Sequence, residues 1–221
     1  FTSSVVAGGM EDDPIITKVI IDQLERRITD GEDPLVLEGQ AWIGKDLNKF
    51  VVKVDFEQVN GETEELELQA LYSKAVDVYW DFQIGVRVDK KPTPSRNWLA
   101  IGFQGLAPYW FEIDTALFIG ENGRTIVRLE AEYEVLFTQR LILTPEIELN
   151  VYGKEDTALG IGSGLSNMEV GLRLRYEILR EFAPYVGINW TTLLGQTETL
   201  ARAAGSDTSD VQIVAGIRAW F

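Results

Sequence analysis

The sequence predicts an all-β protein, a transmembrane antiparallel up-and-down β-barrel of about 12 strands. Three observations lead to this fold class. Apolar and polar residues alternate through segments of roughly ten residues or more. Each segment has one continuous apolar row and one row with charges of both signs, and the connections between segments are alternately short and long. Such strands offer one face to lipid and the other to a polar lumen.

The alternation is clearest in the last third of the chain. Met168, Leu172 and Tyr176 belong to an apolar row, and Glu169 and Arg173 belong to the charged row that alternates with it. A soluble barrel would place the charges outside and the apolar row inside. The opposite assignment, with Met168 facing lipid, suits an outer-membrane barrel.

Twelve segments show this pattern, an even number as in bacterial outer-membrane barrels. We expect them at residues 15–29, 35–44, 49–59, 63–74, 77–89, 97–105, 109–120, 124–137, 139–152, 166–180, 183–194 and 210–221. Residues 1–13, which end in an acidic run, are predicted to be a flexible lead-in. Residues 14–221 are predicted to form one barrel domain, and a closed barrel needs no partner chain, so we expect a monomer.

The connections predict an orientation. Those at residues 45–48, 106–108, 138–140 and 181 are tight, as periplasmic turns are, whereas those at 90–96, 153–166 and 195–210 are wider and rich in small and polar residues. The wider connections are therefore expected to be extracellular loops. Residues 160–164 superficially resemble a phosphate-binding loop, but no Lys follows them, and a flexible loop is the better interpretation.

Composition excludes several function classes. The chain has no Cys and no His, which removes thiolate and imidazole ligands, disulfides and a His general base, so we expect no enzyme. A formal net charge of −15 without a basic stripe argues against nucleic acid as a partner. The longest apolar run, from Trp98 to Phe103, is too short for a membrane helix.

Aromatic residues gather near the expected strand ends, and an interfacial girdle explains most of them. They are Trp42, Tyr72, Tyr79, Trp80, Tyr109, Trp110, Phe111, Tyr152, Phe182, Tyr185 and Trp220. A sugar-binding platform is the alternative, although it would need convergent polar groups. Four bulky residues are expected to point inward and could close the lumen: Trp98, Trp110, Phe118 and Trp220.

Long ungapped blocks of the sequence resemble the copper-resistance protein B family of outer-membrane proteins. The blocks are AWIGKDLNKF from Ala41, ELQALYSKAVDVYWDFQIGVR from Glu67, GLAPYWFEIDTALFIGENGR from Gly105, RLEAEYEVLFTQRLILTPEIELNVYGKED from Arg128, GIGSGLSNMEVGLRLRYEILREFAPYVGINW from Gly160 and the closing VAGIRAWF. The resemblance implies an outer-membrane barrel that takes part in copper resistance. It also implies copper ions as ligand or cargo and a periplasmic copper-resistance protein as partner.

The chain departs from the family in one respect. Family members typically carry a Met- and His-rich segment before the barrel, whereas Met10 and Met168 are the only thioethers here. Soft Cu(I) prefers sulfur ligands and Cu(II) prefers imidazole. Met10, in the lead-in, is the better copper candidate of the two. A barrel that merely anchors a missing copper-binding segment, and a small general porin, are the alternative functions.

Six carboxylates are predicted to line one wall of the lumen. Pairing across residues 121–123 sets Glu112 opposite Glu132 and Asp114 opposite Glu130, and the next strand brings Glu146 and Glu148 beside them. One hypothesis is a weak site or conduit for copper ions with oxygen ligands. The other is a structural network in which arginines neutralise the acids. Its expected members are Asp81, Arg87, Arg128, Arg140, Arg173, Arg175 and Arg218.

Overall fold

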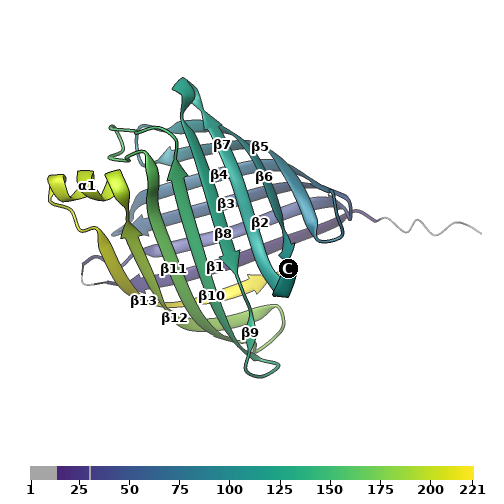
Figure 1. The fold of residues 1–221 in the computed structure, drawn as a ribbon. Helices are drawn as coiled ribbons and strands as arrows, with labels where there is room; N and C mark the ends of the chain where they lie inside the picture. The colour runs from purple at the N-terminus through teal and green to yellow at the C-terminus, as the bar shows by residue number, and fades with distance from the viewer. Residues whose placement is uncertain (1–13, 30) are drawn as a thin grey trace, which may run out of the picture.

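The computed structural model describes residues 14–29 and 31–221 and shows a closed antiparallel barrel (Figure 1). Residues 1–13, and with them the predicted lead-in and Met10, lie outside the described part. The strands are β1 (Ile16–Ile28), β2 (Leu35–Lys45), β3 (Asn48–Val59), β4 (Glu62–Ala75), β5 (Trp80–Lys91), β6 (Arg96–Ala107), β7 (Phe111–Gly120), β8 (Thr125–Glu132), β9 (Val135–Leu136), β10 (Leu141–Tyr152), β11 (Gly164–Tyr176), β12 (Phe182–Leu193) and β13 (Ser209–Trp220).

Consecutive strands pair with one another, except that β8 pairs with β10 and not with the short β9, and β1 pairs with β13 to close the barrel. The segments β8 and β9 are two parts of one crossing, because both pair with β10, so the wall has twelve crossings as predicted. The break between them faces Pro145. Tyr133 donates its N–H to the Pro145 carbonyl at 3.1 Å, but proline has no N–H to return. The ladder is interrupted there.

The two faces of the wall carry the predicted chemistry. Outward side chains such as Val186, Ile188 and Ile213 are exposed and apolar, and Met168 lies in the same outward row as Leu172. Inward side chains such as Arg173 are buried although they are charged. The alternation in the sequence is therefore confirmed as the alternation between a lipid face and a lumen.

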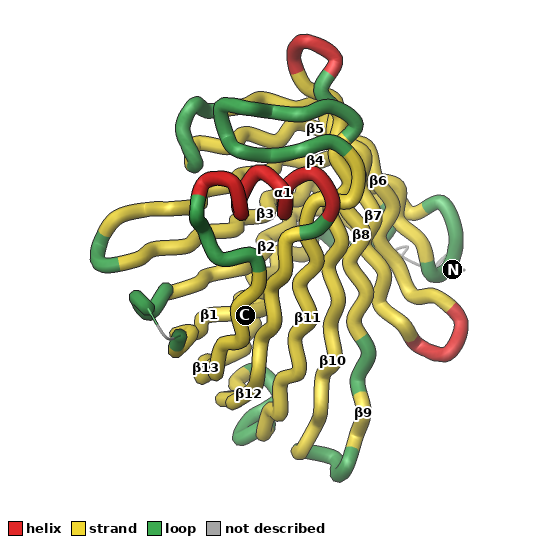
Figure 2. Tube along the Cα trace, turned by 60° about the vertical axis from the view of Figure 1, so that its left-hand side comes forward, coloured by secondary structure: helices red, strands yellow, loops and turns green. Residues whose placement is uncertain are grey.

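The barrel has two unlike ends. At the turn end, the connections are 46–47, 76–79, 108–110, 137–140 and 177–181; at the loop end, they include 153–163 and 194–208. The last of these contains the helix α1 (Gly195–Ala204), which the sequence analysis did not anticipate (Figure 2). Gly205, at φ 77°, ends α1 in the left-handed conformation that favours glycine. Among residues 14–29 and 31–221, no helix has the length and apolar composition to cross a bilayer.

The predicted flexible loop at 160–164 is held by this helix. The Gly162 N–H donates to Thr197 Oγ1 at 2.9 Å, and Gln196 accepts hydrogen bonds from the backbone and side chain of Ser163 at 3.0 and 2.9 Å. The Thr197 hydroxyl also lies 2.7 Å from that of Ser166 on β11. Two connections at the loop end therefore form one hydrogen-bonded unit.

Candidate functional site: a carboxylate-lined cavity in the lumen

The predicted pairing of the lumen carboxylates is confirmed by the register of the strands. Between β7 and β8, Glu112 is the partner of Glu132 and Asp114 is the partner of Glu130. Between β8 and β10, Glu146 pairs with Glu132. Glu148 in turn pairs with Glu130. Because partners in register point to the same face of a sheet, all these side chains point into the lumen.

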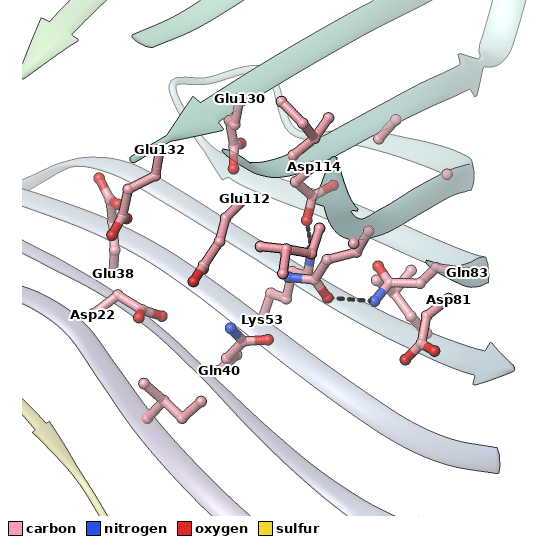
Figure 3. A pocket seen from close by; sticks show the side chains of 18 of the residues that line it. Asp22, Glu38, Gln40, Lys53, Asp81, Gln83, Glu112, Asp114, Glu130 and Glu132 are labelled. Atoms are coloured by element: carbon pink, nitrogen blue, oxygen red, sulfur yellow. Dashed lines mark hydrogen bonds and ion pairs between the residues drawn. The ribbon is translucent and has the colours of Figure 1, made fainter. Parts of the chain in front are cut away.

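A cavity of about 840 Å³ occupies the half of the lumen nearer the turn end. Residues of the turns, including Asp46 and Asp77, line its mouth, and five of the six predicted carboxylates line its wall; Glu148 lies beyond it. Figure 3 shows that Glu112, Asp114, Glu130 and Glu132 face side chains from the opposite strands, among them Lys53. The cavity is thus open to the turn end and bounded by acidic side chains.

Three of the six predicted carboxylates have a close basic partner. Asp114 forms an ion pair with Lys53, which the sequence analysis did not single out. Glu146 accepts a hydrogen bond from Arg173 at 2.8 Å, and Glu132 lies 3.4 Å from Arg218. The predicted neutralisation by basic residues is therefore present along part of this wall.

The remaining carboxylates are less completely paired. Arg128 lies 3.6 Å from Glu148 and 3.8 Å from Glu130, both longer than a good ionic hydrogen bond. Within the part of the chain that the structure describes, Glu112 and Glu38 make no ion pair. The cavity therefore keeps carboxylate oxygens that other cations could approach.

The described residues contain no preformed metal site. Among the described residues, no group of three or more Asp, Glu, His or Cys side chains converges closely enough to hold a metal ion. Met168 points outward on β11 and offers no ligand to the lumen. The donors available in the cavity are carboxylate and amide oxygens, which suit hard or borderline cations and bind Cu(I) poorly.

Two networks cross the loop-end half of the lumen, and each has a buried glutamate at its centre. Glu67, 1% exposed, forms an ion pair with Arg87 at 2.7 Å and accepts a hydrogen bond from Arg128 at 2.9 Å. Glu25, also 1% exposed, accepts from Arg27 at 2.8 Å and from Arg173 at 2.9 Å. The arginines Arg87, Arg128 and Arg173 were expected here, but their partners were not.

The other predicted network members are placed as follows. Asp81 lies 3.2 Å from Lys49 at the turn end, and Arg175 pairs with Glu134 at 2.5 Å. The expectation for Arg140 is wrong, because this residue belongs to the exposed turn 137–140, which joins β9 to β10 outside the lumen.

Large apolar side chains, together with the two buried networks, close the loop-end half of the lumen. We define the sealing belt as the buried inward side chains of the loop-end half, namely Glu25, Arg27, Glu67, Arg87, Trp98, Phe118, Ile126, Asn189 and Val214. Phe118 has no exposed surface, and Trp98 packs with it and with Ile126, so the predicted inward position of both aromatic residues is confirmed. No cavity of comparable size continues beyond the sealing belt in the described chain.

Some aromatic expectations are wrong. Trp110 is 69% exposed in the turn 108–110 and does not fill the lumen. Trp220 lies at the end of β13, where its Nε1 donates to the Arg180 carbonyl at 2.9 Å, outside the cavity lining. Conversely, Trp42 and Tyr152 pack against the apolar cluster inside the barrel instead of joining a girdle.

Tyr185 is a further aromatic residue that the sequence misplaced. It was expected in the girdle, but it is buried in the lumen, where its hydroxyl donates to Glu25 at 2.9 Å. The phenol extends the network around this glutamate. A tyrosine near a strand end has the same sequence signature in both locations, so only the register separates them.

At the loop end, one aspartate ties three segments together. Asp156, in the connection 153–163, pairs with Arg96 at 2.9 Å and with Arg124 at 3.0 Å, and its backbone bridges to Ile161. The hydrogen bond from Arg96 holds the pKa of Asp156 below its usual range. This connection is therefore fastened to the ends of two other strands.

A family model described as Copper resistance protein B precursor (CopB) matches residues 15–221. The chain is 44% identical over 212 residues to Copper resistance protein B of Escherichia coli, an alignment that covers 96% of this chain and 72% of that protein. It is 42% identical, with the same coverage, to the Copper resistance protein B homolog of Pseudomonas syringae pv. tomato.

Solved structures agree on the architecture. The NanC porin superposes with a TM-score of 0.59 at 11% identity, covering 92% of this chain and 99% of that one. The KdgM porin superposes with a TM-score of 0.54 at 9% identity, covering 93% and 99%. At such low identity, these porins support the fold alone.

Proposed function

We propose, from the premise that this chain belongs to the copper resistance protein B family, that its barrel receives copper ions in the carboxylate-lined cavity of the lumen. The chain is an outer-membrane β-barrel of a family that takes part in copper resistance, and the predicted family, fold and localisation are confirmed. The single observation that supports the finer proposal is the open, acidic half-lumen.

The orientation of the cavity follows from a general rule for these barrels. In bacterial outer-membrane barrels, short turns face the periplasm and longer loops face outward. Under this rule, the turn end of the barrel faces the periplasm, and the cavity opens toward it. Copper ions, delivered free or by a periplasmic copper protein, would then enter from that side.

The charge of the cavity favours cations. Of the described residues that line it, eleven are acidic and seven are basic. A negatively charged pocket with low-dielectric walls raises the local concentration of cations. Because the donors are oxygens and no three carboxylates converge, we expect weak, rapidly exchanging binding of Cu(II) and little affinity for Cu(I).

Isothermal titration with Cu(II), and with Cu(I) under reductant, tests this proposal on the purified chain in detergent. The double variant Glu130→Gln/Glu132→Gln removes two cavity carboxylates, and the matched control Glu62→Gln/Glu64→Gln removes two exposed ones at the loop end. We expect Cu(II) binding by the wild type and the control that weakens in the cavity variant. Equal binding by all three proteins would refute the cavity as the site.

A structural anchor for a Met- and His-rich copper-binding segment is the second candidate function. The absence of a converged three-ligand group among the described residues favours it. If the chain binds neither copper ion, whereas a version extended by such a segment does, the anchor is supported. A general porin is disfavoured by the sealing belt, and a large unselective conductance in planar bilayers would reinstate it. That the chain is a monomer without enzymatic activity remains an expectation.

A further inference from the structure

Arg128 on β8 reaches across the lumen at the inner end of the cavity. Its guanidinium binds both carboxylate oxygens of Glu67 on β4, at 2.9 and 3.2 Å. In the order of strands around the barrel, β4 and β8 are four steps apart, so this contact spans the lumen and does not follow the wall. Arg128 also lines the cavity, so it forms part of the boundary between the open half and the sealing belt.

The charged groups nearest to this guanidinium are acidic. Besides Glu67, its nitrogens lie 3.6 Å from Glu148, 3.7 Å from Asp55 and 3.8 Å from Glu130. These four carboxylates come from four different strands, β3, β4, β8 and β10. One positive charge therefore lies near four carboxylates, and within residues 14–29 and 31–221 only Glu67 among them has a second arginine, Arg87, at 2.7 Å.

The aromatic ring of Phe118 fixes the two arginines in place. The guanidinium carbon of Arg87 lies 4.5 Å from the ring centroid and that of Arg128 lies 5.7 Å from it, within the range of cation–π attraction. Phe118 itself has no exposed surface. The route from the cavity toward the loop end is thus blocked by a charged group that is held by carboxylates and supported by a ring.

We propose that the guanidinium of Arg128 is a tethered counter-ion that closes the lumen and holds the place a permeating cation would take. An inorganic cation passing this point would meet the negative charge of Glu67, Asp55, Glu130 and Glu148, but it would not be held there, because no three of these carboxylates converge on one position. This deepens the proposed function, because it names the group that stops copper ions at the inner end of the cavity.

The test is conductance in planar bilayers, with potassium and calcium as the charge carriers, so that it does not depend on copper. Arg128→Met removes the positive charge that repels a cation at the inner end of the cavity and leaves the surrounding carboxylates negative. The conductance should become cation-selective and rise at least about tenfold, because the repulsion of a unit charge a few ångströms from the path of the ion exceeds the equivalent of a tenfold change. Arg128→Lys keeps a positive charge in place and should remain nearly as closed as the wild type.

Two further variants control for trivial explanations. Arg202→Met removes an exposed arginine from α1 and should leave the conductance unchanged. Arg128→Met/Glu67→Gln removes one charge of each sign and should also conduct cations, so it tests the inference even if the single variant fails to fold. Folding of each variant is checked by the heat-dependent mobility of the barrel on gels. An unchanged conductance in both folded Arg128→Met proteins would overturn the inference, and so would an anion-selective increase.

The conductance test and the copper titration can fail independently of each other. Loss of copper binding in the cavity variant, with no conductance change on Arg128→Met, would keep copper uptake and reject the tethered counter-ion. A cation pathway opened by Arg128→Met in a chain that binds no copper would support the counter-ion and reject copper uptake in the cavity.

Discussion

Neutralising Glu25 should destabilise the barrel more than any exposed charge change. The Glu25 side chain is completely buried and accepts hydrogen bonds from Arg27 at 2.8 Å, from Arg173 at 2.9 and 3.0 Å, and from the Tyr185 hydroxyl at 2.9 Å. The variant Glu25→Gln keeps the shape of the side chain but removes its charge. Two buried arginines then lose their shared counter-ion.

The size of the destabilisation depends on the other ion-pair partners that Arg27 and Arg173 keep. Removing one partner of a buried ion pair typically costs about 3–5 kcal/mol, because the other charge is left uncompensated. Here, Arg27 still has Glu169 at 3.0 Å and Arg173 still has Glu146 at 2.8 Å, so the lower end of the range applies. We expect a loss of about 3 kcal/mol in the free energy of unfolding.

Urea titration of the barrel refolded into lipid vesicles measures this loss, with tryptophan fluorescence as the signal. The matched control is Glu198→Gln, because Glu198 pairs with Arg202 at 2.6 Å on the surface of α1, where Arg202 is 68% exposed. An exposed helix pair contributes only about 0.3–0.5 kcal/mol. If Glu25→Gln cost no more than this control, the buried ion pairs of Glu25 would not stabilise the barrel.

Three other changes have defined outcomes. Phe118→Ala should cost about 3–5 kcal/mol in the same titration, because a fully buried ring leaves a void in the sealing belt; a loss below about 1 kcal/mol would contradict this packing. Asp156→Asn should speed proteolysis of the connection 153–163 at neutral pH. In the wild type, the ion pairs of Asp156 should protect this connection from proteolysis at neutral pH. Because the pKa of Asp156 is lowered, the protection should be lost only as the pH falls through that lowered pKa. Cleavage that does not depend on pH would refute the role of these ion pairs. Met168→Leu should leave copper titrations unchanged, because Met168 faces lipid; weaker binding would place it in the site.

The sequence predicted the wall of the barrel well, because each strand obeys one repeated rule. Strict alternation assigns every residue of a segment to lipid or lumen, and a tight connection fixes the register of the next strand. This is why the pairing of Glu112 with Glu132, and of Asp114 with Glu130, could be worked out from residue positions alone. Local pattern and turn length contain that information.

Contacts across the lumen could not be predicted in the same way. The long-range partners of Glu25 and Glu67, namely Arg173, Tyr185 and Arg128, are 61 to 160 residues away in sequence, and their meeting depends on the tilt and closure of the whole barrel. The same holds for Lys53, whose partner Asp114 lies on the opposite wall. The inward arginines were identifiable as a class, but the glutamates that hold them were not.

Deviations from the regular pattern arise from particular residues. Pro145 breaks the ladder between β8 and β9, because its nitrogen cannot donate. The helix α1 was missed because glycine and threonine at its start suggest a loop, whereas the following Leu200, Ala201 and Arg202 are good helix formers. Trp110 fits the alternation of the predicted strand at residues 109–120, but it lies in the turn before β7.

The most direct test of the central claim, that this barrel acts in copper resistance through its acidic cavity, is growth at raised copper. Cells that lack their own copper-resistance barrel would produce the wild-type chain, the Glu130→Gln/Glu132→Gln variant or the Glu62→Gln/Glu64→Gln control, at equal levels of folded barrel in the outer membrane. We predict that the wild type and the control protect the cells and that the cavity variant protects them less. Equal protection by the cavity variant would contradict the account.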